Sequence, residues 1–191
     1  MGDLSASISG RTLHELRVPG SHNSGSDVLR DGVAPGEPLV YAAVPCIIRG
    51  WSECQVECVS EHLRAGCRYI DLRTAAVKGK PGLRIVHGLV GGPVLDVLEQ
   101  VSAFLAASTQ EVVILDFQHF YEVSQAQQAA LLGQCLELFS AAGCIPPEKV
   151  HMRMLMHNAQ CTCTCTCTCT VHASHPKRRQ QHPTPSPKPQ P

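Results

Sequence analysis

This sequence lacks a net charge. Its 16 Lys and Arg residues balance its 16 Asp and Glu residues, and charged residues make up only 17% of the chain. The basic cluster at 177–179 lies in a proline-rich stretch. Because a nucleic-acid-binding face requires concentrated positive charge, nucleic acid is not an expected partner.

Long apolar runs are also missing. No stretch reaches the roughly 18 apolar residues that a membrane-spanning helix needs. The N-terminal residues MGDLSASISG show neither the charged nor the apolar region of a secretory signal. We therefore expect no transmembrane segment, and a cytoplasmic location that allows peripheral attachment to membranes.

The cysteines lack a compact disulfide spacing. Without a secretory signal, free thiols are the expected state of those in the first 157 residues. Two of them stand four residues apart, a spacing that could hold a metal, but no second ligand pair lies nearby, so a helix position is the better interpretation. No metal or cofactor is expected. These cysteines are Cys46, Cys54, Cys58, Cys67, Cys135 and Cys144.

Two parts with different compositions make up the chain. Residues 1–157 have the composition of a globular domain, whereas residues 158–191 contain a Cys-Thr repeat followed by a proline-rich end. The second part cannot build a core and is predicted to be a disordered low-complexity tail. A metal site along the cysteines of the repeat is the less favoured alternative, because no surrounding fold would set its geometry.

Apolar patterns alternate along the first part. Strands are predicted at 68–73, 83–86 and 111–117, and helices at 52–65, 93–107 and 123–142, with a long loop at 29–50. An apolar stretch at 13–18 precedes the first turn. The alternation favours parallel strands joined by crossover helices, which is the α/β class.

Polar side chains stand where these strands end. The first apolar stretch runs into PGSHNSG, a turn of small residues that presents a histidine. Functional side chains of such folds gather at the C-terminal ends of the strands. The residues selected by this rule are His22, Asp71, Arg73, His87, Gln118 and His119.

Two histidines and an arginine suit the cleavage of a phosphodiester. One imidazole can take a proton from an attacking hydroxyl while the other gives a proton to the leaving oxygen. A guanidinium binds two phosphate oxygens and keeps its charge. By itself, a histidine beside a glycine, as at His87, is a weak signal and favours a structural role over a catalytic one.

Four motifs resemble a known family. VPGSHNSG, AGCRYIDLR, IVHG and EVVILDF follow one another as in the X domain of phosphatidylinositol-specific phospholipase C. The resemblance covers about residues 12–150. It implies a distorted TIM-type (β/α) barrel that cleaves an inositol phospholipid at a membrane surface into diacylglycerol and a cyclic inositol phosphate.

The resemblance also implies roles for single residues. His22 corresponds to the general base that deprotonates the inositol 2-hydroxyl, and His87 to the general acid. Arg73 matches the metal-independent members, whereas calcium-dependent members carry an acid there; Gln118 stands where those members place a ligand glutamate. The resemblance therefore implies catalysis without a metal.

Two further positions carry an implied contact with the substrate. Asn23 stands where metal-independent members usually have aspartate, and it could bond the substrate hydroxyl or orient His22. Asp71 could orient Arg73, contact the substrate through a neighbour, or be a buried structural acid. Both are predicted substrate-binding residues.

The family barrel has roughly twice the strands that this sequence shows. We therefore expect the N-terminal half of a barrel, with the carboxylate that orients the base histidine supplied by the half that is missing. This truncated chain is then expected to be inactive. The alternative function is a catalytically dead fragment that binds phosphoinositides or a protein partner.

Overall fold

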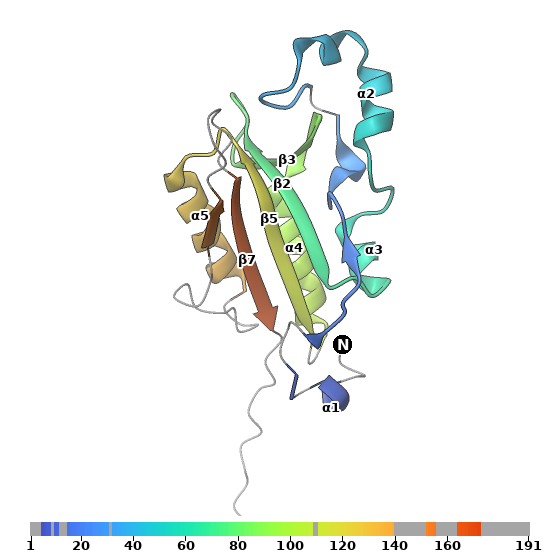
Figure 1. Cartoon of the computed structure of the whole chain (residues 1–191), viewed down its shortest axis with the longest axis vertical. Helices are drawn as coiled ribbons and strands as arrows, with labels where there is room; N and C mark the ends of the chain where they lie inside the picture. Colours follow the sequence, from blue (N-terminus) through green and yellow to red (C-terminus); the bar gives the residue numbers. More distant parts are fainter. Residues whose placement is uncertain are drawn as a thin grey trace, which may run out of the picture.

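A seven-stranded sheet forms the centre of the fold (Figure 1). The structure is a computed structural model that describes residues 5–8, 10–11, 15–30, 32–108, 111–139, 152–155 and 164–172. The main series of strands has the order β4-β3-β2-β5-β7-β6, and β1 pairs with β2 outside this series. The strands are β1 (Gly20–Ser21), β2 (Tyr69–Ala76), β3 (Leu83–His87), β4 (Leu89–Pro93), β5 (Val112–Tyr121), β6 (Met152–Leu155) and β7 (Thr164–His172).

Helices connect and cover these strands. The α-helices are α1 (Ser5–Ile8), α2 (Pro45–Ser52), α3 (Val59–Arg64), α4 (Val94–Ala106) and α5 (Gln125–Leu138), and the 3-10 helices are η3 (Ser26–Val28) and η4 (Leu39–Ala43). Strands β1 and β5 each pair in parallel with β2. The connection from β1 to β2 contains α2 and α3, and the connection from β2 to β5 contains α4. This arrangement confirms the α/β class and the expected half barrel.

The parallel arrangement predicted for all three strands is wrong for 83–86. Strand β3 returns antiparallel to β2, with Thr74 opposite Ile85, and β4 returns antiparallel to β3. Gly79 and Gly82 have φ of 78° and 65° between β2 and β3, so the chain reverses there. The connection is also shorter than the dozen or so residues that a parallel crossover requires.

One predicted helix begins too early. The helix expected at 52–65 is α3, which starts at Val59 and ends before Gly66, whose φ is 103°. The loop expected at 29–50 contains η4 and α2, and α2 starts with Pro45 in its first turn, where the missing N–H has no cost. The other two predicted helices are confirmed as α4 and α5, the latter beginning at a capping box from Ser124 to Gln127.

The outer face of the sheet packs against the helices. Residues that alternate along β2 and β5 share a core with one side of α4 and with parts of α3 and α5. Leu72, Leu98 and Leu115 are all completely buried in this core. Burial of this face fixes the register, because a shift of one residue would move the apolar side chains to the opposite face.

Part of the tail at 158–191, which was predicted to be disordered, forms a β-strand. Residues 164–172 form β7 antiparallel to β5, with Leu115 opposite Cys169, and β6 pairs with β7. A strand thus covers the edge of β5 away from β2. The end of the expected domain at 140–150, Cys144 and the residues after 172 lie outside the described residues.

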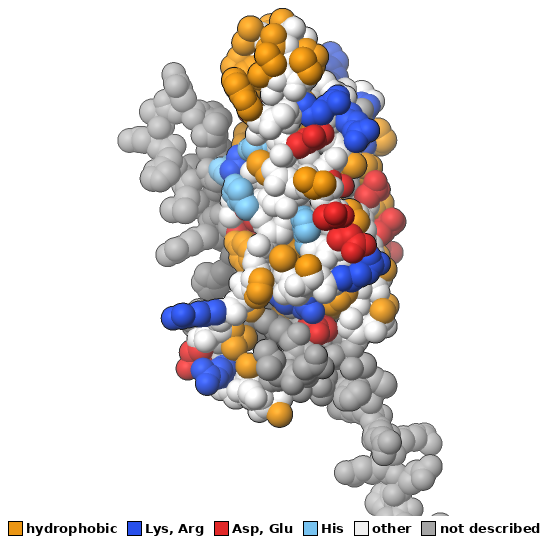
Figure 2. Space-filling view, turned by 90° about the vertical axis from the view of Figure 1, so that its right-hand side faces the viewer, with side chains coloured by type: hydrophobic (Ala, Val, Ile, Leu, Met, Phe, Trp, Pro, Cys, Tyr) orange, Lys and Arg blue, Asp and Glu red, His pale blue; other side chains and the backbone are white. Residues whose placement is uncertain are grey.

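Large apolar side chains are exposed at one end of the molecule (Figure 2). Leu39 is 87% exposed and Trp51 is 72% exposed. Neither η4 nor α2, the elements that carry them, nor any other helix in the described ranges is long and apolar enough to cross a membrane. We call this surface the apolar rim patch: Leu39, Val40, Val44, Ile47 and Trp51.

Replacing Leu98 with alanine tests the core between α4 and the sheet. Leu98 is fully buried, so Leu98→Ala should lower the free energy of unfolding by about 2–5 kcal/mol in urea denaturation. Leu95, 43% exposed on the same helix, is the matched control. Leu95→Ala should change the free energy of unfolding by less than about 1 kcal/mol. Equal effects of the two substitutions would show that α4 does not pack as described.

Candidate active site

Asp71 holds His22 from the neighbouring strand. Pairing of β1 with β2 sets Ser21 opposite Ile70, so the turn after β1 lies over the next residue of β2. His22 Nδ1 is 2.7 Å from the Oδ2 atom of Asp71. A carboxylate accepts, so Nδ1 carries the proton of neutral His22, and its Nε2 is free to take another. The His22 side chain is 64% exposed, whereas the carboxylate is buried.

Backbone groups of the same turn bind Asp71 as well. The Asn23 N–H donates to Asp71 Oδ1 at 2.6 Å, and the Ser24 N–H donates to the Asp71 carbonyl at 2.9 Å. Asn23 has a left-handed backbone with φ of 49°, which asparagine tolerates better than most residues. At Gly25, φ is 79° and an added Cβ would lie 3.2 Å from Val97 Cγ2. The turn therefore has one tightly packed conformation.

These contacts correct one expectation. His22 was expected to lack a carboxylate partner in this chain, but Asp71 supplies one on the adjacent strand. The contact with His22 is not among the roles predicted for Asp71, and the carboxylate binds the His22 turn rather than Arg73. The predicted contacts of Asp71 and Asn23 with a substrate remain predictions.

His87 reaches the site from the opposite direction, at the end of the antiparallel strand β3. Its Nδ1 lies 2.8 Å from the carbonyl oxygen of Ser52, the last residue of α2. A carbonyl only accepts, so this nitrogen carries a proton. Gly88 has φ of 68°, and a Cβ there would lie 2.5 Å from Ser52 Oγ. Glycine is therefore needed for the close approach of α2 to His87.

Asn23 joins the two histidines. Its backbone binds the carboxylate that holds His22, while its side-chain Nδ2 is 3.3 Å from His87 Nε2. The same Nδ2 is 3.3 Å from Cys54 Sγ, which in turn is 3.5 Å from His87 Nδ1. Cys54 was not predicted as a site residue, because its spacing from Cys58 suggested a helix, whereas it lies in the loop between α2 and α3.

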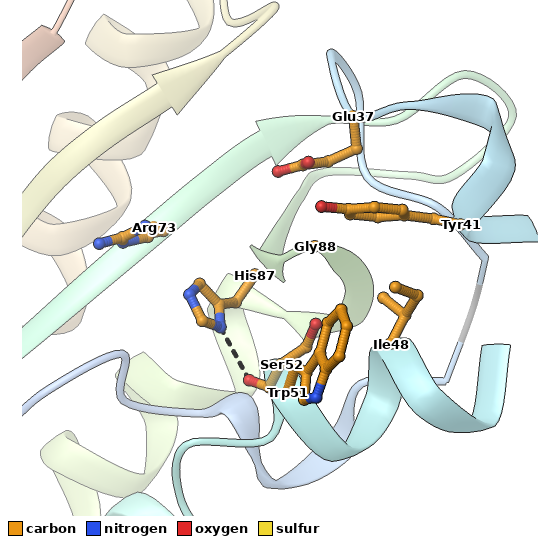
Figure 3. A pocket seen from close by; sticks show the side chains of 8 residues that line it. All are labelled: Glu37, Tyr41, Ile48, Trp51, Ser52, Arg73, His87 and Gly88. Carbon is orange, nitrogen blue, oxygen red and sulfur yellow. Dashed lines mark hydrogen bonds between the residues drawn. The ribbon is translucent and has the colours of Figure 1, made fainter. Parts of the chain in front are cut away.

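A cavity of about 200 Å³ opens beside His87 (Figure 3). Arg73 of β2 lines it together with His87, and Trp51 of the apolar rim patch contributes to its opposite side. The Nε atom of Arg73 is buried without a hydrogen-bond partner. His22 does not line this cavity and is connected to it through Asn23. The full lining is Glu37, Tyr41, Ile48, Trp51, Ser52, Arg73, His87 and Gly88.

Polar residues continue along the inner face of the sheet. Tyr69 OH donates to the Oδ2 atom of Asp116, and Gln118 Nε2 is 3.3 Å from the same oxygen. Burial and then the bond to Asp116 raise the pKa of Tyr69 to about 12. The other carboxylate oxygen of Asp116 is buried without a partner.

A bulge in β5 adds His119 to this face. Leu72 pairs with Phe117, but the next residue, Arg73, pairs with His119, so Gln118 is the extra residue. Burial and then the charge of Arg73 lower the pKa of His119. The strand-end rule selects His119 from the sequence, but the family motif has no clear counterpart for this residue, so no role is predicted for it.

Metal-ligating residues do not cluster in the described ranges: no group of three or more His, Cys, Asp or Glu side chains is placed to hold a metal ion. Five of the cysteines predicted to be free thiols are free in the structure: Cys46, Cys54, Cys58, Cys67 and Cys135. The described part of the chain thus places an imidazole and a guanidinium in the cavity wall, with the carboxamide of Asn23 and the thiol of Cys54 in contact with that imidazole.

Residues 47–159 match the family described as phosphatidylinositol-specific phospholipase C, X domain. PI-PLC X domain-containing protein 2 of Mus musculus is 32% identical over 157 residues, which are 75% of this chain and 45% of the relative. PI-PLC X domain-containing protein 3 of Danio rerio is 33% identical over 75% of this chain and 48% of its own length. The chain spans about half the length of these relatives.

Two matches that cover a smaller part of this chain are to proteins named as phospholipases C. Variant-surface-glycoprotein phospholipase C of Trypanosoma cruzi is 33% identical over 63% of this chain and 36% of its own length. A structure concerned with membrane binding of phosphatidylinositol-specific phospholipase C from S. aureus has a TM-score of 0.46 and 23% identity. It covers 62% of this chain and 34% of that one.

Removing the charge of Arg73 tests the inner face. Because that charge disfavours protonation of His119, Arg73→Met should raise the pKa of His119, measured by NMR titration of the histidine rings. The pKa should stay below the ordinary value, since burial is the larger cause. Arg64→Met, on an exposed side chain of α3, is the control. An unchanged pKa in Arg73→Met would contradict the placement of Arg73 beside His119.

Proposed function

Because the chain belongs to the phosphatidylinositol-specific phospholipase C X-domain family, we propose that it carries the acid-base groups of an inositol phospholipid phosphodiesterase. The single observation that supports this most is the pair of histidines held in complementary ways around Asn23. His22 has a free Nε2 to act as a base. His87 has its Nδ1 engaged, so its Nε2 is the nitrogen that exchanges a proton.

His22 begins the proposed reaction by taking the proton of the inositol 2-hydroxyl. The hydroxyl oxygen forms a bond to phosphorus, and the bond from phosphorus to the glycerol oxygen breaks. His87 gives a proton to that leaving oxygen, so the products are diacylglycerol and a cyclic inositol phosphate. Arg73 stabilises the phosphate oxygens as negative charge builds on them.

The residues around Asp71 do not suit a catalytic calcium ion. Calcium binds several oxygen ligands, with carboxylates prominent among them. Here both carboxylate oxygens of Asp71 are engaged by the His22 turn, and Arg73 brings a positive charge to the same strand two residues on. We propose that the guanidinium of Arg73 does the charge-stabilising work without a metal.

The apolar rim patch supports action at a membrane surface. Exposed apolar area of this kind marks a contact with lipid or protein, and Trp51 belongs both to the patch and to the cavity wall. A lipid whose tails contact η4 and α2 would present its headgroup to the cavity. We propose a cytoplasmic protein that binds inositol phospholipids peripherally.

A chimera tests the catalytic proposal. It joins this chain to the C-terminal part of the Mus musculus relative that the chain does not cover, and release of inositol phosphate from phosphatidylinositol vesicles is measured. His22→Ala and His87→Ala should each lower kcat by about 10²- to 10⁴-fold. A chelator should leave the rate unchanged, and loss of activity in the chelator would contradict catalysis without a metal.

The 191-residue chain alone should be slower than the chimera by on the order of 10²-fold. No described strand pairs β4 with β6, so the described sheet is open and one side of the site has no wall. Turnover by the chain within about tenfold of the chimera, abolished by His22→Ala, would show that the open sheet suffices.

A lipid- or partner-binding fragment without catalysis is the second candidate, favoured by the exposed rim patch beside an intact cavity. Co-sedimentation with vesicles should show a preference for inositol lipids that Arg73→Ala removes. Trp51→Ala should weaken binding to every vesicle, by about tenfold if burial of the ring contributes what large apolar side chains usually do. Leu95→Ala, on α4, is the control. Identical binding by Arg73→Ala would exclude headgroup recognition by this cavity.

A further inference from the structure

The side chain of Asn23 lies between two titratable groups and is only partly satisfied. Its Nδ2 is 3.3 Å from His87 Nε2 and 3.3 Å from Cys54 Sγ. Its Oδ1 has no hydrogen-bond partner although the residue is only 4% exposed. A buried carbonyl oxygen without a partner is unfavourable, so only the contacts of Nδ2 favour this orientation of the carboxamide.

The Ser52 carbonyl determines which nitrogen of His87 exchanges a proton. It accepts from Nδ1, so that nitrogen stays protonated and Nε2 alone gains or loses a proton. In neutral His87, Nε2 is an acceptor and suits the Nδ2 donor of Asn23. In charged His87, Nε2 carries a proton, and two donors would face each other. Figure 3 shows the second ring nitrogen on the side away from Ser52.

A half-turn of the carboxamide removes this conflict. It exchanges Oδ1 and Nδ2, so Oδ1 accepts from the charged Nε2 and gains the partner that it now lacks. Cys54 allows both orientations, because a thiol can accept from Nδ2 or donate to Oδ1. The half-turn moves Nδ2 to the buried position where Oδ1 now has no partner, so the gain comes from the charged partner of Oδ1.

We infer that the Asn23 carboxamide turns over when His87 gains or loses its proton, and so positions His87 in both of its charge states. Asn23 is thus a positioning residue that acts through His87, and the thiol of Cys54 is the second partner of this switch. Only the role of His87 as the acid rests on the proposed function. The switch is inferred from the contacts of Asn23 with Cys54 and His87 and from the contact of Ser52 with His87.

Other charged and titratable groups face His87 as well. Arg73 lines the cavity from β2, and Glu37 and Tyr41 line it from the segment before α2. Cys54 approaches the ring from the loop after α2. Replacing Asn23 removes the contact of its Nδ2 with Cys54 but leaves Arg73, Glu37 and Tyr41 in the cavity wall, so a shift in the titration of His87 reports on the carboxamide and its thiol partner.

NMR titration of the histidine rings in the full 191-residue chain tests the switch. Asn23→Gly should lower the titration midpoint of His87 by about half to one pH unit. The replacement removes the hydrogen bond to neutral His87 and the hydrogen bond to charged His87, and the second of these is the stronger. Asn23→Asp should raise it by about one unit, because a carboxylate only accepts. Both replacements suit the left-handed backbone of Asn23.

The sign of the Asn23→Gly effect decides between a turning and a fixed carboxamide. A carboxamide that only donates to Nε2 favours neutral His87, so its removal would raise the midpoint, and that result would overturn the inference. Unchanged midpoints in both variants would overturn it as well. His62, which lies 2.9 Å from Ser21 Oγ beside the turn, reports that the fold is intact. Cys46→Ser, an exposed thiol on α2, should leave the midpoint unchanged.

A measurement on the unaltered chain completes the test. The side-chain NH₂ resonances of Asn23 should shift with the same midpoint as His87, and resonances that do not respond would overturn the inference. No substrate is present in either titration. An inactive chimera therefore contradicts the proposed function alone, whereas a silent carboxamide contradicts only the switch.

Discussion

The buried carboxylate of Asp71 is the contact on which the rest of the site depends. A buried charge must be hydrogen-bonded, and the turn at 22–24 provides three groups that bind this residue: an imidazole and two backbone N–H groups. Because Asp71 lies on β2, which pairs with strands on both of its sides, the sheet sets the position of the turn. The orientation of His22 and the location of Asn23 both follow from this.

Alternate side chains of β2 lie on opposite faces of the sheet, so one set packs in the core and the other belongs to the site. Ile70 and Leu72 face the helices and are completely buried, while Asp71 and Arg73 lie on the opposite face. The same strand thus contributes to the core with one set of side chains and to the site with the other. The bulge in β5 adds to the polar set, because it pairs His119 with Arg73.

What the sequence could predict depended on how local the signal was. The strand at 68–73, the helix α4 and the turn that presents His22 all follow from periodicity and turn residues over short windows. The contact from Ser52 to His87 and the approach of Cys54 to His87 join residues 35 and 33 positions apart, and no local pattern encodes them. The reversal of β3 is closer in sequence, because Thr74 lies opposite Ile85 and the turn between them contains Gly79 and Gly82. The bulge at Gln118 is local: the buried apolar side chains of β5 alternate up to Phe117 and resume at Phe120, one residue out of step.

Helix α2 connects the surface to the proposed acid. Its exposed side chains, Ile47 and Trp51, belong to the apolar rim patch, and its last residue, Ser52, provides the carbonyl that fixes Nδ1 of His87. Gly88 allows the helix to approach so closely that no side chain could be inserted between them. A contact that shifts α2 therefore shifts the acceptor of the His87 ring.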